Sequence, residues 1–229
     1  MGHHWTWYSL VPGLDKVPAH VTGAATVLVL LTIISLVVRR KYAASDGTIP
    51  DQGISLRSIA EVSIEKLIDL TEGVIGKEGR DFFPFLGALF IYIFISNMMG
   101  LIPGFLPPTD SLNTNGACAI IVFIYYNYLG FKKNGASYLK HFTGPIWWLA
   151  ILMIPIEIVG HLARPFSLSV RLFGNINGDH MVLSIFTDLT KLVIPVAFYA
   201  LGLFVAFIQA LVFTLLSMVY INISISHEH

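Results

Sequence analysis

Several ionisable side chains interrupt the apolar C-terminal part of the sequence, between residues 142 and 226. They are Glu157, His161, Arg164, Arg171, Asp179, His180, Asp188 and Lys191. An ionisable group inside a membrane segment costs about 2.5–3.5 kcal/mol on insertion scales, and such groups often mark paths for protons or ions. Carboxylates and imidazoles accept and release protons, whereas a guanidinium keeps its positive charge. The pattern therefore indicates proton handling rather than bond-making catalysis.

The spacing of these side chains predicts a polar stripe on one helix. Glu157, Arg164 and Arg171 are seven residues apart, a spacing that keeps them on one face of an α-helix. The same stripe carries His161, Asn175, Gly160, Ser167, Gly174 and Gly178. We expect an apolar opposite face, formed by Ile158, Leu162, Phe166, Leu172, Phe173 and Ile176. Because small residues let another helix approach closely, the polar stripe is a candidate packing surface.

Arg171 is the member of the stripe that is hardest to explain as structural. No acidic residue lies three or four positions from it, and a guanidinium cannot lose its proton to escape burial. We expect it to meet water, carbonyl groups or a carboxylate from elsewhere. Glu157, in contrast, has possible partners on its own helix, because it can form a structural pair with His161 or with Arg164. The sequence does not decide between the two.

Gln209 provides a second polar group near the level of Arg171. Asp188 to Lys191 marks a polar turn between two apolar runs; Arg171 lies 17 residues before Asp188, and Gln209 lies 18 residues after Lys191. In an antiparallel hairpin the two side chains come to nearly the same level. The amide is therefore interpreted as part of the same site, although a lone glutamine can also serve as a simple interhelical contact.

The composition places the whole chain in a bilayer. Of its 229 residues, 55% are hydrophobic and 12% are charged, about half of the roughly 25% charged share of soluble domains. This excludes a disordered chain, and the balance of 14 basic and 14 acidic residues argues against nucleic-acid binding. With the single cysteine Cys118 there is no internal disulfide. We find no catalytic motif, metal site or cofactor motif.

The hydropathy pattern predicts an all-α integral membrane protein, with about five membrane-embedded helices in one polytopic domain spanning residues 1–229. The expected helices cover residues 21–38, 82–106, 115–131, 145–187 and 192–226, the last two forming a hairpin. An amphipathic helix is expected over about 57–76, either as a solvated linker or as a surface helix that docks a partner. At 43 residues and ~64 Å, the run 145–187 either breaks near Pro165 or is strongly tilted.

Basic residues set the expected orientation. Arg39 and Arg40 follow the first apolar run, and Lys132 and Lys133 follow the third. Because basic flanks stay in the cytoplasm, we expect the N-terminus outside and the C-terminus in the cytoplasm.

Residues 167–175, Ser-Leu-Ser-Val-Arg-Leu-Phe-Gly-Asn, resemble the signature of subunit a of the F-type ATP synthase, the stator that faces the rotor ring. Residues 94–103, the pair Gln209-Ala210 and Tyr220 are also similar to that family, and the resemblance extends from about residue 60 to the end. It implies a strongly tilted hairpin against the c-subunit ring. It also implies a subunit b stalk and the remaining synthase subunits as partners, in a bacterial inner membrane.

The resemblance also implies roles for individual residues in proton translocation. Arg171 matches the family's essential arginine and Glu157 its acid on the cytoplasmic side, and Arg164 matches a basic residue before proline. The family's proton path from the outside includes polar residues that match Asn97, Asn175 and Gln209. Nine residues after the arginine, where several relatives carry glutamate, this chain has His180 preceded by Asp179; we assign the inlet relay to these two jointly. The alternative function is a stand-alone secondary transporter with Arg171 in its substrate site.

Overall fold

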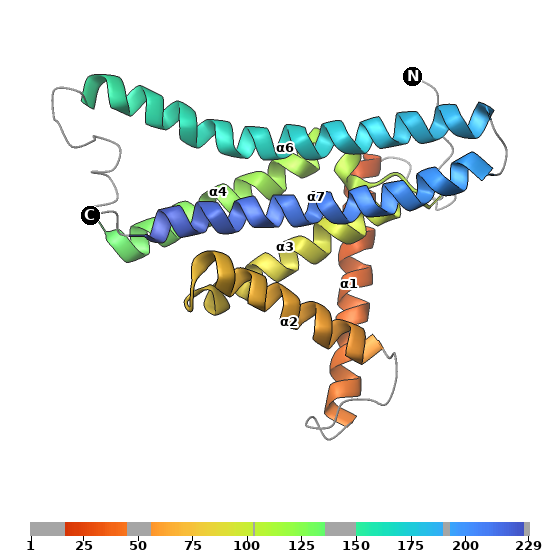
Figure 1. Cartoon of the computed structure of the whole chain (residues 1–229), viewed down its shortest axis with the longest axis horizontal. Helices are drawn as coiled ribbons and strands as arrows, with labels where there is room; N and C mark the ends of the chain where they lie inside the picture. Colours follow the sequence, from red (N-terminus) through yellow and green to blue (C-terminus); the bar gives the residue numbers. More distant parts are fainter. Residues whose placement is uncertain (1–16, 45–55, 103, 136–149, 190–192, 227–229) are drawn as a thin grey trace. The chain divides into compact units, whose positions relative to one another are not determined.

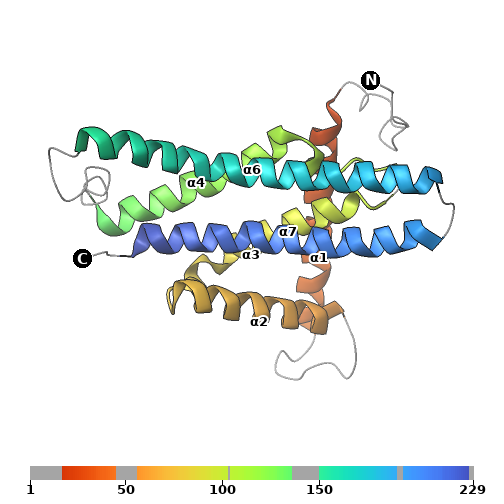
Figure 2. The same ribbon diagram turned by 45° about the horizontal axis from the view of Figure 1, so that its top comes forward.

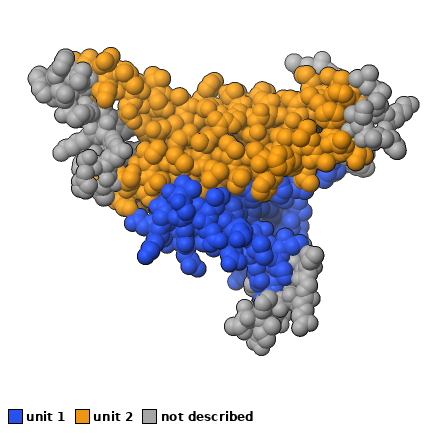
Figure 3. All heavy atoms as spheres, viewed as in Figure 1, with its two compact units in different colours: residues 1–108 blue, residues 109–229 orange. Residues whose placement is uncertain are grey.

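The computed structural model describes residues 17–44, 56–102, 104–135, 150–189 and 193–226, and it is all-helical over these residues. Its contacts divide the chain into two compact units, residues 1–108 and 109–229, coloured separately in Figure 3. The predicted all-α class is confirmed, while the expectation of a single domain over residues 1–229 stays a prediction.

The first unit contains three helices, α1 (Ala19–Ala44), α2 (Leu56–Ile75) and α3 (Gly79–Met99), each in contact with the other two. Figures 1 and 2 show α1 crossing the pair formed by α2 and α3. Their core includes Val27, Leu86 and Ile93, none of which is exposed. The helix expected over 82–106 begins earlier and ends at Met99, where the Gly100 amide donates to the Asn97 carbonyl and the Leu101 amide to the Met98 carbonyl.

The turn between α2 and α3 depends on two glycines for different reasons. Gly76 ends α2 with a positive φ of 90°, a conformation that costs glycine little. Gly79 begins α3 against the backbone of α2, where an added Cβ would lie 2.7 Å from the carbonyl oxygen of Thr71. Thr71 is itself fully buried, and its hydroxyl donates to the Leu67 carbonyl.

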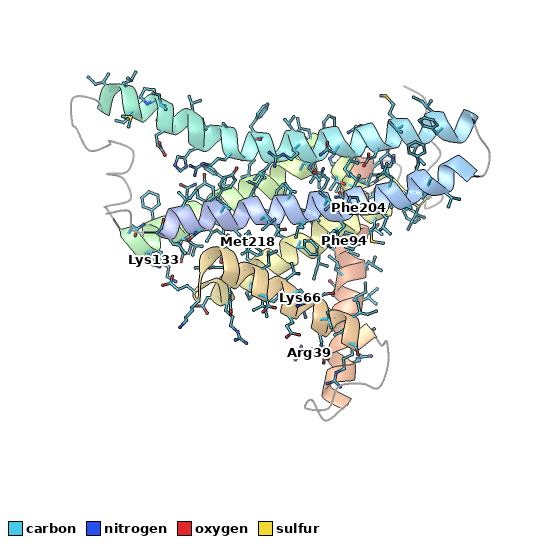
Figure 4. All side chains as sticks on the ribbon, in the orientation of Figure 1. Arg39, Lys66, Phe94, Lys133, Phe204 and Met218 are labelled. Carbon is cyan, nitrogen blue, oxygen red and sulfur yellow. The ribbon has the colours of Figure 1, made fainter. Side chains whose placement is uncertain are left out.

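The second unit consists of α4 (Leu112–Asn134) and two long helices, α6 (Ala150–Leu189) and α7 (Val193–Ile225). A short 3-10 turn, η3 (Pro108–Asp110), precedes α4, and the Ser111 hydroxyl caps α4 by accepting from the Asn113 amide. The antiparallel hairpin of α6 and α7 has α4 packed against both members (Figures 1 and 2). Lys133, in the last turn of α4, is labelled in Figure 4.

The length question for the first hairpin helix is resolved in favour of an unbroken helix. α6 runs for 40 residues through Pro155 and Pro165, whereas the expected residues 145–149 lie outside the described part of the chain. At 1.5 Å per residue it is about 60 Å long, twice the ~30 Å hydrocarbon core. A helix of this length crosses a bilayer only by tilting or by extending beyond the hydrocarbon.

Within the described residues, four helices are long and apolar enough to cross a membrane: α1, α3, α6 and α7. The expected span at 115–131 forms α4 but lies outside this group, because tyrosine and asparagine residues interrupt its apolar sequence. The expected amphipathic helix at 57–76 corresponds to α2, whose Ile59 and Val62 remain exposed.

We expect Gly79→Ala to destabilise the chain by about 1–3 kcal/mol, the usual cost of overpacking, because the added methyl meets backbone atoms of Thr71. The measurement is the thermal unfolding of the detergent-solubilised protein.

The matched control is Gly73→Ala in α2, where an added Cβ has nothing within 4 Å. The control should be neutral or slightly stabilising, since alanine favours helices over glycine. Equal effects of the two substitutions would contradict the close approach at Gly79.

Candidate functional site

Polar and aromatic side chains from all three long helices of the second unit converge around Tyr126. This tyrosine of α4 is 1% exposed, and its hydroxyl lies 3.1 Å from Nδ1 of His161 on α6. The guanidinium carbon of Arg164 lies 6.0 Å from the centre of the Tyr126 ring and 5.3 Å from that of Tyr220 on α7. We call Tyr126, His161, Arg164 and Tyr220, together with Glu157, the aromatic cluster.

Glu157 joins the cluster through His161 rather than through Arg164. Its Oε1 lies 3.3 Å from Nε2 of His161, and its side chain is 41% exposed, against 12% for His161. Arg164 makes no ion pair with any described residue and instead lies over two aromatic rings, a favourable place for a cation. The structure therefore decides between the two pairs that the sequence left open.

Arg171 lies on a surface of α6 that the described residues leave uncovered. Its side chain is exposed, and no described carboxylate lies within ion-pair distance of it. Gly174 and Gly178, one and two turns further along α6, would have nothing within 4 Å of an added Cβ, and the same holds for Gly160. We call Arg171, Gly160, Ser167, Gly174 and Gly178 the small-residue face of α6.

The apolar side of α6 is divided between packing inside the unit and exposure. Leu172 and Ile176 are 1% and 4% exposed and pack inward, whereas Leu162 and Phe166, assigned to the same face, are 59% and 68% exposed. Seven residues fall about 20° short of two helical turns. Over fourteen residues this drift rotates Arg171 by about 40° away from Glu157, toward the small-residue face.

The register of the hairpin can be read from two contacts between α6 and α7. Phe186 stacks on Phe198 with ring centres 4.4 Å apart. Arg164 faces Tyr220, 22 residues further from the turn on each helix. Midway between these contacts, Gln209 is level with Asn175, one helical turn from Arg171. The expected level is therefore displaced by about one turn.

The remaining predicted site residues occupy two places. Asp179 and His180 are half-buried on α6, two helical turns beyond Arg171. Asn97 belongs to α3 of the first unit, where it is 3% exposed beside the fully buried Ser96. Ser96 Oγ has no hydrogen-bond partner among the described residues, and a buried polar atom of this kind commonly contacts water.

Sequence reasoning missed Tyr126 and did not assign His161 a role of its own. The available signal was the run Tyr125-Tyr126-Asn127-Tyr128 within an otherwise apolar segment. Within the described part of the chain, no group of three or more His, Cys, Asp or Glu side chains is placed to hold a metal ion.

The chain is similar to proteins of one known family. The family described as ATP synthase A chain matches residues 21–222. "ATP synthase subunit a" of Bdellovibrio bacteriovorus is 43% identical over 98% of this chain and 99% of its own length. The proteins of the same name from Trichlorobacter lovleyi and Geobacter sulfurreducens are 47% and 43% identical, over 89% and 93% of this chain and 86% and 93% of their own lengths.

The two arginines of α6 should contribute differently to the stability of the chain. Arg164→Met should lower the free energy of unfolding by about 1 kcal/mol, the scale of a partly buried cation–π contact. Arg171→Met should change it by less than about 0.5 kcal/mol, as expected for a surface position. Thermal unfolding of both variants in detergent makes the comparison. A larger loss for Arg171→Met would contradict the exposed position of Arg171 without an ion pair among the described residues.

Proposed function

The chain belongs to the ATP synthase A chain family and is the non-catalytic proton-channel stator, subunit a, of an F-type ATP synthase. It is a multi-pass membrane protein. On that premise we propose that Arg171 faces the carboxylates of a c-subunit ring. The observation that carries the proposal is the exposed guanidinium on the small-residue face. A charge in that position needs a carboxylate or water from outside the chain, and small residues let a ring helix approach closely.

In the proposed mechanism, two aqueous half-channels lead to Arg171. A proton from outside passes Asn97, then Asn175, Gln209 and the relay pair Asp179 and His180, and it neutralises a ring carboxylate. Asn175 and Gln209, level on the two hairpin helices, support the inlet path. Once neutral, the carboxyl group enters lipid, where its charged form would be very costly.

The outlet half-channel lies on the opposite side of Arg171, toward Glu157 and Arg164. After nearly a full turn of the ring, the carboxyl group loses its proton past Glu157. The fixed charge of Arg171 keeps the carboxylate ionised as it passes and keeps protons from moving directly between the half-channels. Each proton crossing 100 mV releases about 2.3 kcal/mol, so several protons drive the formation of one ATP.

The proposed orientation and partners follow the same logic. Arg39 and Arg40 at the end of α1, and Lys132 and Lys133 at the end of α4, favour a cytoplasmic position for both ends. The N-terminus then lies outside and the C-terminus inside a bacterial inner membrane, with the c-ring, the subunit b stalk and the other synthase subunits as partners. Family membership favours this stator over a stand-alone transporter.

Arg171→Gln should abolish proton-driven ATP synthesis in inverted membrane vesicles, because the permanent charge at the ring is lost. Arg171→Lys should also lose coupled synthesis, since a lysine keeps the charge but not the planar set of donors.

The matched control is Arg39→Gln, which removes an exposed arginine at the end of α1 (Figure 4) and should leave the synthesis rate near that of the unmodified enzyme. Near-normal synthesis by Arg171→Gln would show that the role assigned to this residue is wrong.

A further inference from the structure

Tyr126 is held rigidly at the centre of the second unit. Its ring packs at 5.4 Å from Phe123 and 6.1 Å from Tyr220, measured between ring centres. Its backbone carbonyl accepts a 2.6 Å hydrogen bond from the Ser224 hydroxyl, and the Ser224 carbonyl accepts one from the Asn134 amide group. These contacts join α4 to the C-terminal half of α7, so the Tyr126 hydroxyl is a fixed point.

His161 connects this fixed point to Glu157. One ring nitrogen faces the Tyr126 hydroxyl at 3.1 Å and the other faces the Glu157 carboxylate at 3.3 Å. When Tyr126 donates its hydroxyl proton to Nδ1, a neutral imidazole carries its own proton on Nε2 and donates it to Glu157. Tyr126 thus selects the tautomer of His161, and His161 fixes the carboxylate.

We propose that His161 is a positioning residue for proton release, which orients Glu157 through a chain of polar contacts anchored at Tyr126 and makes release depend on pH. The proposal rests on the proposed function, in which Glu157 receives the proton that leaves the ring. A contact between an imidazole and a carboxylate favours the orientation of the carboxylate that keeps its oxygen toward the ring nitrogen.

The pH dependence follows from the groups around His161. Glu157 and Arg164 face it from its own helix, Tyr126 faces it from α4, and Tyr220 of α7 borders the same cluster. A protonated imidazole forms an ion pair with Glu157 and competes with incoming protons for that carboxylate. Because imidazoles titrate near neutral pH, proton release should slow as the cytoplasmic side becomes acidic.

A structural role alone would not produce this pH dependence. The amide nitrogen of a glutamine at position 161 can still donate to the Glu157 carboxylate, as Nε2 of the imidazole does, but the variant loses the contact with the Tyr126 hydroxyl and does not titrate. The His161→Gln variant therefore separates a purely structural role of the side chain at position 161 from a role that depends on its titration.

The test measures proton-driven ATP synthesis by the whole synthase in inverted vesicles, with the driving force held constant while the pH of the outer medium varies from 7.5 to 5.5. His161→Gln should lower the rate at pH 7.5 by up to about tenfold, the effect of losing one hydrogen bond, here that to Tyr126, and should lose the acid-side decline of the unmodified enzyme. Tyr126→Phe should also lower the rate. Its matched control Tyr128→Phe, at a tyrosine 58% exposed on the same helix, should not.

The double variant Glu157→Gln/His161→Gln identifies the residue through which His161 acts. Glu157→Gln alone should impair synthesis without abolishing it, because water can substitute at an open outlet. Adding His161→Gln should cause no further loss, since coupled residues are not additive.

Additive losses, or an unchanged pH profile in His161→Gln, would overturn the positioning role while leaving the proposed outlet through Glu157 intact. A normal rate for Glu157→Gln alone would overturn the outlet itself, and the positioning role with it.

Discussion

The permanent charge of Arg171 is the constraint on which the rest of the molecule depends. A guanidinium cannot become neutral in an apolar environment, and no described residue of this chain provides it with a carboxylate. The helix that carries it keeps glycines at positions 174 and 178 open, so that a neighbouring helix can come close. This arrangement is the basis for our proposal that the carboxylate comes from a partner chain.

Other polar side chains of α6 pack against α4 and α7, unlike Arg171. Arg164 lies over Tyr220 and Tyr126, and Glu157 contacts His161, so these side chains contribute to the packing against α4 and α7. Glu157, His161 and Arg164 are therefore half-buried against these helices, whereas Arg171, further along α6, is exposed. The same helix thus supports the internal structure of the subunit and carries the face that we propose for the contact with the ring.

The sequence was sufficient for the helical class, the approximate helix positions and the lack of an acidic partner for Arg171 among the described residues of its own helix, because apolar run lengths and the spacing of charges along one helix are local properties. It was not sufficient for the faces of α6: Leu172 packs inward and Phe166 does not, a difference that depends on where α4 covers the hairpin. Tyr126 was missed for the same reason, since its role comes from His161, 35 residues away. The continuity of α6 through Pro165 likewise depends on the fold, because a proline in a membrane helix is compatible with both outcomes.

The most direct test of the account is a disulfide cross-link between Gly174→Cys on the small-residue face and a cysteine introduced at the ring-carboxylate level of the outer c-subunit helix, in a Cys118→Ala background. We predict efficient cross-linking at Gly174→Cys, where an added Cβ meets no other atom of the chain within 4 Å. We predict none at Leu172→Cys, whose side chain is 1% exposed and directed into the subunit. Cross-linking at position 172 but not at position 174 would contradict the assignment of the Arg171 face to the ring.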